Sequence, residues 1–206
     1  MKWSSLLLLL LAAFFLEPFF GSGRFVGITS SLIFVVTMVG ASFFNRMGRT
    51  VFIAQCVVAA IWMVFVLFEG SSSQIHALAA VSSFALVISA SVVTFWHLLH
   101  AKRYDADLLY GAIFGYLLIA MSFAFVFYSI ERWSPGSFLL ATHTADWASF
   151  LYFSLVTITT LGYGEISPLH PFARILAALE AVIGVMYVAV LIGAIVGSYR
   201  NLRFDS

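Results

Sequence analysis

The stretch that decides the fold is the run Thr157-Ile158-Thr159-Thr160-Leu161-Gly162-Tyr163-Gly164-Glu165. Its two glycines flank one tyrosine, and glycine reaches backbone angles that other residues avoid, including φ > 0. Alternating such positions with bulkier residues can turn consecutive carbonyls to the same side of an extended chain, which makes a ladder of oxygens. Residues 147–160 upstream predict a short aromatic helix, and a long apolar helix is predicted to begin near Pro171. The order is therefore helix, glycine-rich segment, helix.

This arrangement resembles the pore of potassium channels. The run Thr159–Gly164 matches the signature of the family's filter, with Leu161 where many members carry valine or isoleucine. The resemblance covers roughly residues 108–199, with counterparts for the outer helix, pore helix, filter and inner helix. Pro168 and Arg174 also stand where many members have a proline and a basic residue. The resemblance implies a pore that conducts K⁺.

The resemblance places the ion site on the filter backbone. The residues expected to bind K⁺ through their carbonyls, with the Thr160 hydroxyl at the inner end, are Thr160, Leu161, Gly162 and Tyr163, and Gly164 completes the filter. These oxygens replace the water shell of the ion. Tyr163 is expected to point away from the pore axis and to brace the filter against the pore helix. K⁺ is thus the expected transported ion, and no cofactor is expected.

The residues expected to support the filter are Thr159, Glu165, Tyr152 and Glu180. Glu165 stands where the family usually has an aspartate, whose bond to an aromatic residue of the pore helix clamps the filter; the matching aromatic is Tyr152. Val156 stands where some members have a buried glutamate, so that carboxyl pair is absent. Asp146, or Thr144, suits the N-terminal cap of the pore helix.

Glu180 is the one acid clearly inside a predicted membrane segment, where a carboxyl is costly and usually functional. It could face a water-filled cavity in ionised form, so that four copies make an acidic ring. It could instead lie behind the filter, protonated and bonded to pore-helix hydroxyls such as Ser154 or Thr157, and counting from Gly164 favours this placement.

Gly184 follows one turn after Glu180, where the family's inner helix often has its gating hinge. A glycine there can also serve close helix packing.

The composition identifies an integral membrane protein. Hydrophobic residues make up 63% of the chain and charged residues 9%, against about 25% charged in soluble domains. A net charge of +1 gives no reason to expect a nucleic-acid partner. Cys56 is the single cysteine, so no intrachain disulfide is expected.

A membrane span needs about 20 apolar residues. The stretches that meet this are near Trp3–Phe20, Phe25–Phe44, Thr50–Phe68, Ile75–Leu99, Leu108–Ile130 and Phe172–Tyr199. The expected fold is an all-α integral membrane protein with six transmembrane helices and a re-entrant pore helix and selectivity filter between the fifth and sixth. The expected domains are a four-helix N-terminal membrane domain (1–100), a cytoplasmic linker (101–107), the pore domain (108–200) and a short cytoplasmic tail (201–206).

The first stretch has a second interpretation. Lys2 and the leucine run Leu6–Leu11 also resemble a secretory signal peptide. No Ala-x-Ala cleavage site follows them, which argues against cleavage. The predicted topology is the same either way.

The distribution of basic residues predicts the orientation, because cytoplasmic loops are rich in Lys and Arg. With the N-terminus inside, the inner side carries Lys2, Arg46, Arg49, Lys102, Arg103, Arg200 and Arg203, and the outer side carries Arg24, Arg132 and Arg174. Both termini are then cytoplasmic and the filter faces outward. We expect the protein in the plasma membrane or the bacterial inner membrane.

The chain holds one filter motif, and K⁺ filters use four such loops. The expected assembly is therefore a homotetramer in contact with membrane lipids. The fourth stretch, Ile75–Leu99, contains no Lys or Arg, whereas a voltage sensor needs several such charges. Steep voltage gating is not expected, and an unidentified regulatory partner, a lipid, pH or the filter itself could open the pore.

The predicted function is passive, potassium-selective conduction. A weakly selective cation channel is the first alternative, if Leu161 loosens the filter. A non-conducting membrane scaffold or sensor subunit is the second. An enzyme is not expected, because the sequence shows no nucleophile–base pair, zinc motif or Gly-x-Ser-x-Gly. His143 and His170 are expected near the outer mouth, where they could make the pore sensitive to external pH.

Overall fold

The computed structural model of the protein describes residues 2–20, 32–33, 35–41, 43, 49–67, 85–92, 94, 96, 106–140 and 145–204. The chain divides into two compact units. One comprises Met1–His100 with Ala106–Leu118, and the other comprises Ala101–Asp105 with Ile119–Ser206. The long helix α5 (Ala106–Trp133) contributes its first half to the first unit and its second half to the second unit.

The first unit contains α1 (Lys2–Phe20), α3 (Arg49–Leu67) and the start of α5. The bounds of α1 and α3 agree with the first and third predicted stretches. The second and fourth stretches lie partly outside the described residues, and those of their residues that are described are helical.

The start of α1 packs on the first half of α5 through Trp3. The Trp3 backbone N–H donates to the Asp107 carboxylate at 3.1 Å. The Trp3 ring covers Gly111 so closely that a Cβ there would lie 2.9 Å from the ring, and its centroid is 5.7 Å from that of Phe114. Gly111 therefore provides the space into which Trp3 fits.

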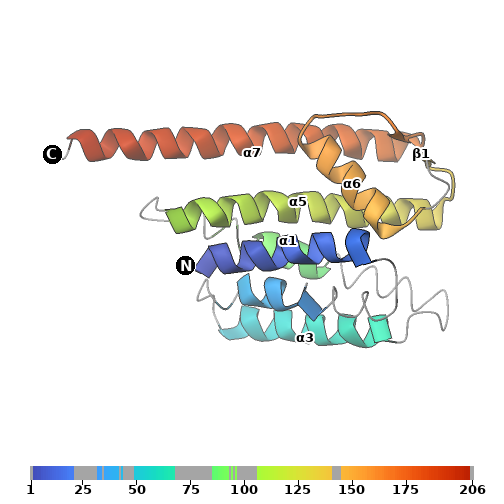
Figure 1. Cartoon of the computed structure of the whole chain (residues 1–206), viewed down its shortest axis with the longest axis horizontal. Helices are drawn as coiled ribbons and strands as arrows, with labels where there is room; N and C mark the ends of the chain where they lie inside the picture. Colours follow the sequence, from blue (N-terminus) through green and yellow to red (C-terminus); the bar gives the residue numbers. More distant parts are fainter. Residues whose placement is uncertain are drawn as a thin grey trace. The chain divides into compact units, whose positions relative to one another are not determined.

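The second unit contains the rest of α5, β1 (Phe138–Leu140), α6 (Trp147–Ile158), β2 (Ile166–Pro168) and α7 (Pro171–Phe204). Figure 1 shows α6 running obliquely between α5 and α7. The helix starts follow local sequence rules. The Asp146 side chain caps α6 by accepting from the Ser149 N–H at 2.9 Å, as predicted. Proline is favoured in the first turn of α7, where its missing N–H costs nothing.

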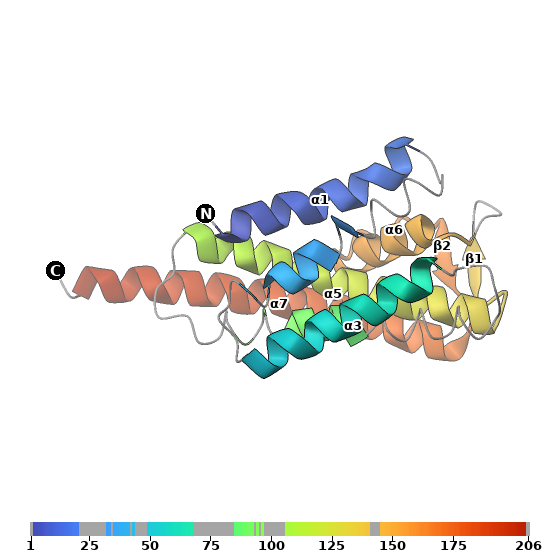
Figure 2. The same ribbon diagram turned by 90° about the horizontal axis from the view of Figure 1, so that it is seen from below.

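A small sheet, which the all-α prediction did not include, joins the segments on either side of the pore helix and filter. β1 and β2 pair antiparallel, with Phe138 opposite Pro168 and Leu140 opposite Ile166, and Figure 2 shows them side by side. The Ser137 carbonyl extends the connection by accepting from the N–H groups of Leu169 at 2.8 Å and His170 at 3.1 Å. β2 is therefore fixed to the segment that follows α5.

The turn between α5 and β1 is held by Glu131, a buried carboxylate at the end of α5. One of its oxygens accepts from the Gly136 N–H at 2.8 Å, and the other accepts from the Phe138 N–H at 3.0 Å. Gly136 has φ +86°, a left-handed conformation that favours glycine. Glu131 thereby fixes the backbone at the point where β1 begins.

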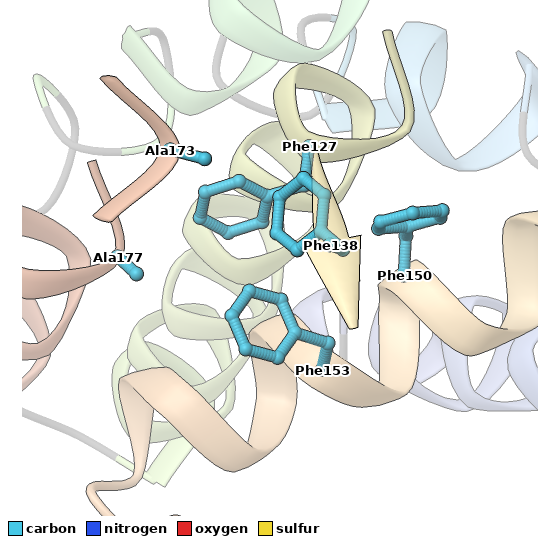
Figure 3. Packing of buried hydrophobic residues seen from close by; sticks show 6 residues of the cluster. All are labelled: Phe127, Phe138, Phe150, Phe153, Ala173 and Ala177. Atoms are coloured by element: carbon cyan, nitrogen blue, oxygen red, sulfur yellow. The ribbon is translucent and has the colours of Figure 1, made fainter. Parts of the chain in front are cut away.

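An aromatic cluster forms the core behind this sheet (Figure 3). Its buried members are Phe127, Phe138, Phe150, Phe153, Ala173 and Ala177. The centroid of the Phe138 ring lies 5.7 Å from that of Phe127, 5.1 Å from that of Phe150 and 5.5 Å from that of Phe153. These ring pairs pack edge to face. Aromatic pairs favour such geometry. Phe138 therefore anchors β1 to both α5 and α6.

Two helices among the described residues are long and apolar enough to cross a membrane, Asp107–Trp133 and Pro171–Gly193. They correspond to the fifth and sixth predicted spans. The 12 residues of α6 extend about 18 Å at 1.5 Å per residue, whereas the hydrocarbon core is about 30 Å thick. α6 is thus too short to span and suits a re-entrant segment. The count of six spans stays a prediction.

Candidate functional site

The segment after α6 has an alternating backbone. Thr160 has φ +58°, Gly162 has φ +60° and Gly164 has φ +84°, while Leu161 and Tyr163 between them do not have positive φ. Thr160 is the only non-glycine residue with positive φ in the described part of the chain. A β-branched residue there is an outlier, and such strain costs about 1–3 kcal/mol and gathers at functional sites.

The sequence predicted such an alternation from its two glycines. The structure adds a third position with positive φ, at Thr160. Successive left-handed and right-handed positions rotate the peptide planes so that consecutive carbonyls can face one side. The arrangement suits a line of oxygens for a dehydrated cation. The two glycines were visible in the sequence, but the strained Thr160 was not.

The end of α6 fixes where this segment starts. The N–H of Thr160 donates to the Thr157 carbonyl at 2.9 Å, and the N–H groups of Leu161 and Gly162 donate to the Val156 carbonyl at 2.9 and 3.3 Å. The Thr159 hydroxyl also donates to the Leu155 carbonyl, at 2.7 Å. These N–H groups are therefore hydrogen-bonded to carbonyls of α6. The negative end of the α6 helix dipole lies beside the segment, where it favours a cation.

The same segment is exposed in a single chain. Residues 159–165 are all exposed, including 55% of Leu161 and 66% of Tyr163. Exposed apolar side chains of this size are typical of a surface that contacts another protein or the membrane. The bracing contact predicted for Tyr163 stays a prediction about the assembled protein.

The structure brings the predicted pair Tyr152 and Glu165 together. The Tyr152 hydroxyl donates to a carboxylate oxygen of Glu165, across the outer end of the segment. Both side chains are exposed in a single chain. The longer glutamate therefore still reaches the aromatic residue of α6, in the position that the resemblance assigned to a clamp.

We expect Tyr152→Phe to weaken the filter without changing its backbone. The variant loses one hydrogen bond to a charged group, and solvent weakens this bond because both side chains are exposed. The expected result is a lower melting temperature of the purified protein in K⁺. Glu165→Ala should give a similar decrease, and the double variant little more, because both changes remove the same bond. Fully additive decreases would contradict the clamp.

Glu180 lies inside the second unit. Its side chain is 0% exposed, and the Ser154 hydroxyl is hydrogen-bonded to one of its carboxyl oxygens. Ser154 is one of the two partners that the sequence proposed for it. A carboxyl fully buried within one chain does not face a water-filled cavity, so this geometry supports the placement behind the filter and opposes the acidic ring.

Gly184 lies against the last residue of α6. A Cβ at Gly184 would be 2.2 Å from the Ile158 carbonyl oxygen and 2.7 Å from its Cγ1. The glycine therefore permits close approach of α7 to the residue that leads into the filter. α7 continues as a helix through this point. The hinge role stays a prediction, and the packing role has direct geometric support.

Glu131 and Ser137 are positioning residues that the sequence reasoning missed. Both fix the strand pair next to the filter, through contacts with backbone groups. A signal was available, because Ser134-Pro135-Gly136, which begins three residues after Glu131, is a turn sequence that follows a predicted helix. The long-range pairing of β1 with β2 had no such local signal.

The histidines predicted near the outer mouth are only partly described. His170 Nδ1 accepts from the Phe172 N–H at 3.2 Å at the start of α7. His143 lies outside the described residues. The described part of the chain contains no group of three or more His, Cys, Asp or Glu side chains that could hold a metal ion.

Comparisons with known proteins agree with this geometry. The family described as "Ion channel" matches residues 113–200. The potassium voltage-gated channel protein shk-1 of Caenorhabditis elegans is 33% identical over 89 residues, 43% of this chain and 16% of the relative. The two pore potassium channel c of Oryza sativa is 33% identical over 91 residues, 44% of this chain and 19% of the relative.

A prokaryotic relative gives a longer match. The voltage-gated potassium channel of Aeropyrum pernix is 25% identical over 118 residues, 57% of this chain and 34% of the relative. The chain thus spans about a third or less of the length of these relatives. The family match points to a channel and not to an enzyme. Residues 113–200, which are less than half of the chain, thus match the ion channel family, and this part of the chain is similar to segments of potassium channels.

Proposed function

We propose that the chain is the subunit of a homotetrameric channel that conducts K⁺ passively and selectively across a cell membrane. The observation that carries this proposal is the alternation of positive φ at Thr160, Gly162 and Gly164, directly after a helix too short to span a bilayer. The proposed ligands of K⁺ are the backbone carbonyls of residues 160–163, with the Thr160 hydroxyl at the inner end. A carbonyl ladder binds an ion that has lost its water shell.

The tetramer follows from the need for a ring of carbonyls. One chain supplies one line of oxygens, and K⁺ filters use four. The large exposed apolar side chains of α7 are Phe172, Ile175, Leu179, Val182, Val185, Met186, Val188, Val190 and Ile192. This surface suits contact with neighbouring subunits and lipid acyl chains. We propose a multi-pass arrangement with cytoplasmic termini.

A flux assay tests the proposed conduction. Purified protein in liposomes with a K⁺ gradient should pass K⁺ when a protonophore balances the charge, and replacement of K⁺ by Na⁺ should abolish the flux. Equal fluxes of the two ions would favour a weakly selective cation channel. Absence of any flux from intact tetramers would favour a non-conducting scaffold or sensor.

We expect the open probability to depend weakly on voltage. The fourth predicted span, Ile75–Leu99, contains no Lys or Arg, and moving one charge through 100 mV is worth only about 2.3 kcal/mol. Single-channel recordings in symmetrical K⁺ from strongly negative to strongly positive potentials should show a shallow change. Steep opening within a few tens of millivolts, without added blocker, would contradict this.

A further inference from the structure

The Ser154 hydroxyl lies between two oxygen atoms, and each of them is close enough to form a hydrogen bond with it. Its oxygen is 2.5 Å from the backbone carbonyl of Ala120 on α5, and it is also hydrogen-bonded to a carboxyl oxygen of Glu180 on α7. Ser154 itself is on α6 and fully buried. One side chain therefore links three helices of the second unit.

A serine hydroxyl carries one proton, whereas a carbonyl and a carboxylate can only accept. The Ala120 carbonyl has no proton of its own, so the Ser154 proton is directed to it. The contact between Ser154 and Glu180 then needs its proton from the carboxyl group. We infer that Glu180 is a neutral carboxylic acid that donates to Ser154 Oγ, while Ser154 donates to Ala120.

The described residues around Glu180 offer no positive charge that would stabilise an ionised carboxylate. Its second oxygen, Oε2, has no hydrogen-bond partner among the described residues. α6 contains no Lys, Arg or His, and Arg174 on α7 is exposed. The charged residues of α5 within the second unit, Glu131 and Arg132, are about three turns from Ala120. An unpaired buried charge is far more costly than one unpaired neutral oxygen.

The Glu180 carboxyl contacts α6 one turn before the end of that helix. Glu180 and Gly184 are one turn apart on α7, and their partners Ser154 and Ile158 are one turn apart on α6. α7 is thus joined to the last turn of α6 by a hydrogen bond at one level and by close backbone packing at the next. Thr159 and the filter follow immediately. Glu180 is accordingly a positioning residue for the filter, a role that depends on the proposed function.

Infrared spectroscopy tests the protonation directly. In oriented bilayers at neutral pH, the wild type should show the carbonyl stretch of a protonated carboxylic acid, and Glu180→Gln should lose that band. Ser154→Ala should shift the band, because its hydrogen bond is removed. Glu131→Gln is the matched control. Glu131 accepts two N–H bonds as a carboxylate, so its replacement should leave the band unchanged. An unchanged band in Glu180→Gln would overturn the inference.

The K⁺/Na⁺ permeability ratio distinguishes two roles of Glu180, one in which its hydrogen bond positions the filter and one in which the side chain only fills a buried space. A glutamine amide can still donate to Ser154, so Glu180→Gln should keep the wild-type K⁺/Na⁺ permeability ratio, whereas Glu180→Leu should lower it. Equal loss of selectivity in both variants would overturn the role of the donated bond. The infrared result does not depend on conduction. A wild type with the band but without ion flux would refute the proposed function and leave the neutral Glu180 intact.

Discussion

Gly162→Ala is expected to abolish potassium-selective conduction. Gly162 has φ +60°, and no atom of the described residues lies within 4 Å of the position that a Cβ would take in one chain. The expected effect therefore comes from backbone strain rather than from a collision. An L-residue in the left-handed region costs roughly 1–2 kcal/mol, or about 4–8 kcal/mol over four copies in one ring. Currents of the reconstituted variant in K⁺ and Na⁺ would measure the effect.

Gly136→Ala is the matched control for this variant. Gly136 also has positive φ, at +86°, and a Cβ at this position would likewise meet no atom of the described residues within 4 Å, but Gly136 lies in the turn before β1. The variant should lose a similar amount of stability per chain and keep its selectivity. If Gly162→Ala channels discriminated K⁺ from Na⁺ as well as the wild type does, residues 160–164 would not be the filter.

Gly184→Ala is expected to have the second largest effect. The added methyl would lie 2.2 Å from the Ile158 carbonyl oxygen, so either α7 or the end of α6 has to move. Overpacking of this kind costs about 1–3 kcal/mol per chain. Because Ile158 directly precedes the filter, we expect both a lower melting temperature and smaller K⁺ currents.

Gly193→Ala provides the control on the same helix. Among the described residues, no atom lies within 4 Å of the place that a Cβ would take at Gly193, and α7 is helical there too. Alanine is about 1 kcal/mol more favourable than glycine within a helix, so this variant should be neutral or slightly more stable. A Gly184→Ala protein with wild-type stability and currents would refute the packing role of Gly184.

Most of the second unit could be predicted from local sequence. The predicted start of the pore helix at Trp147 is correct because Asp146 caps it, and the inner helix begins at Pro171 as expected. For the placement of Glu180 behind the filter, the sequence suggests pore-helix hydroxyls such as Ser154 or Thr157 as partners, and the structure has Ser154. These successes rest on caps, helical spacing and glycine chemistry, which act over a few residues.

The remaining features depend on residues far apart in the chain. The pairing of Phe138 with Pro168 brings together segments on either side of α6, and no periodicity indicates it in strands of three residues. The close contact of Gly184 with Ile158 depends on how two helices cross. The periodicity of apolar residues along the sequence does not predict these features.

The reversal potential under bi-ionic conditions tests the central claim most directly. With K⁺ on one side of a planar bilayer and Na⁺ on the other, a filter made of the carbonyls of residues 160–163 predicts a strongly displaced reversal potential. Its sign should be that of K⁺ moving down its gradient. A reversal potential near zero in a conducting wild-type protein would show that Na⁺ passes as readily as K⁺. It would contradict potassium selectivity in this pore.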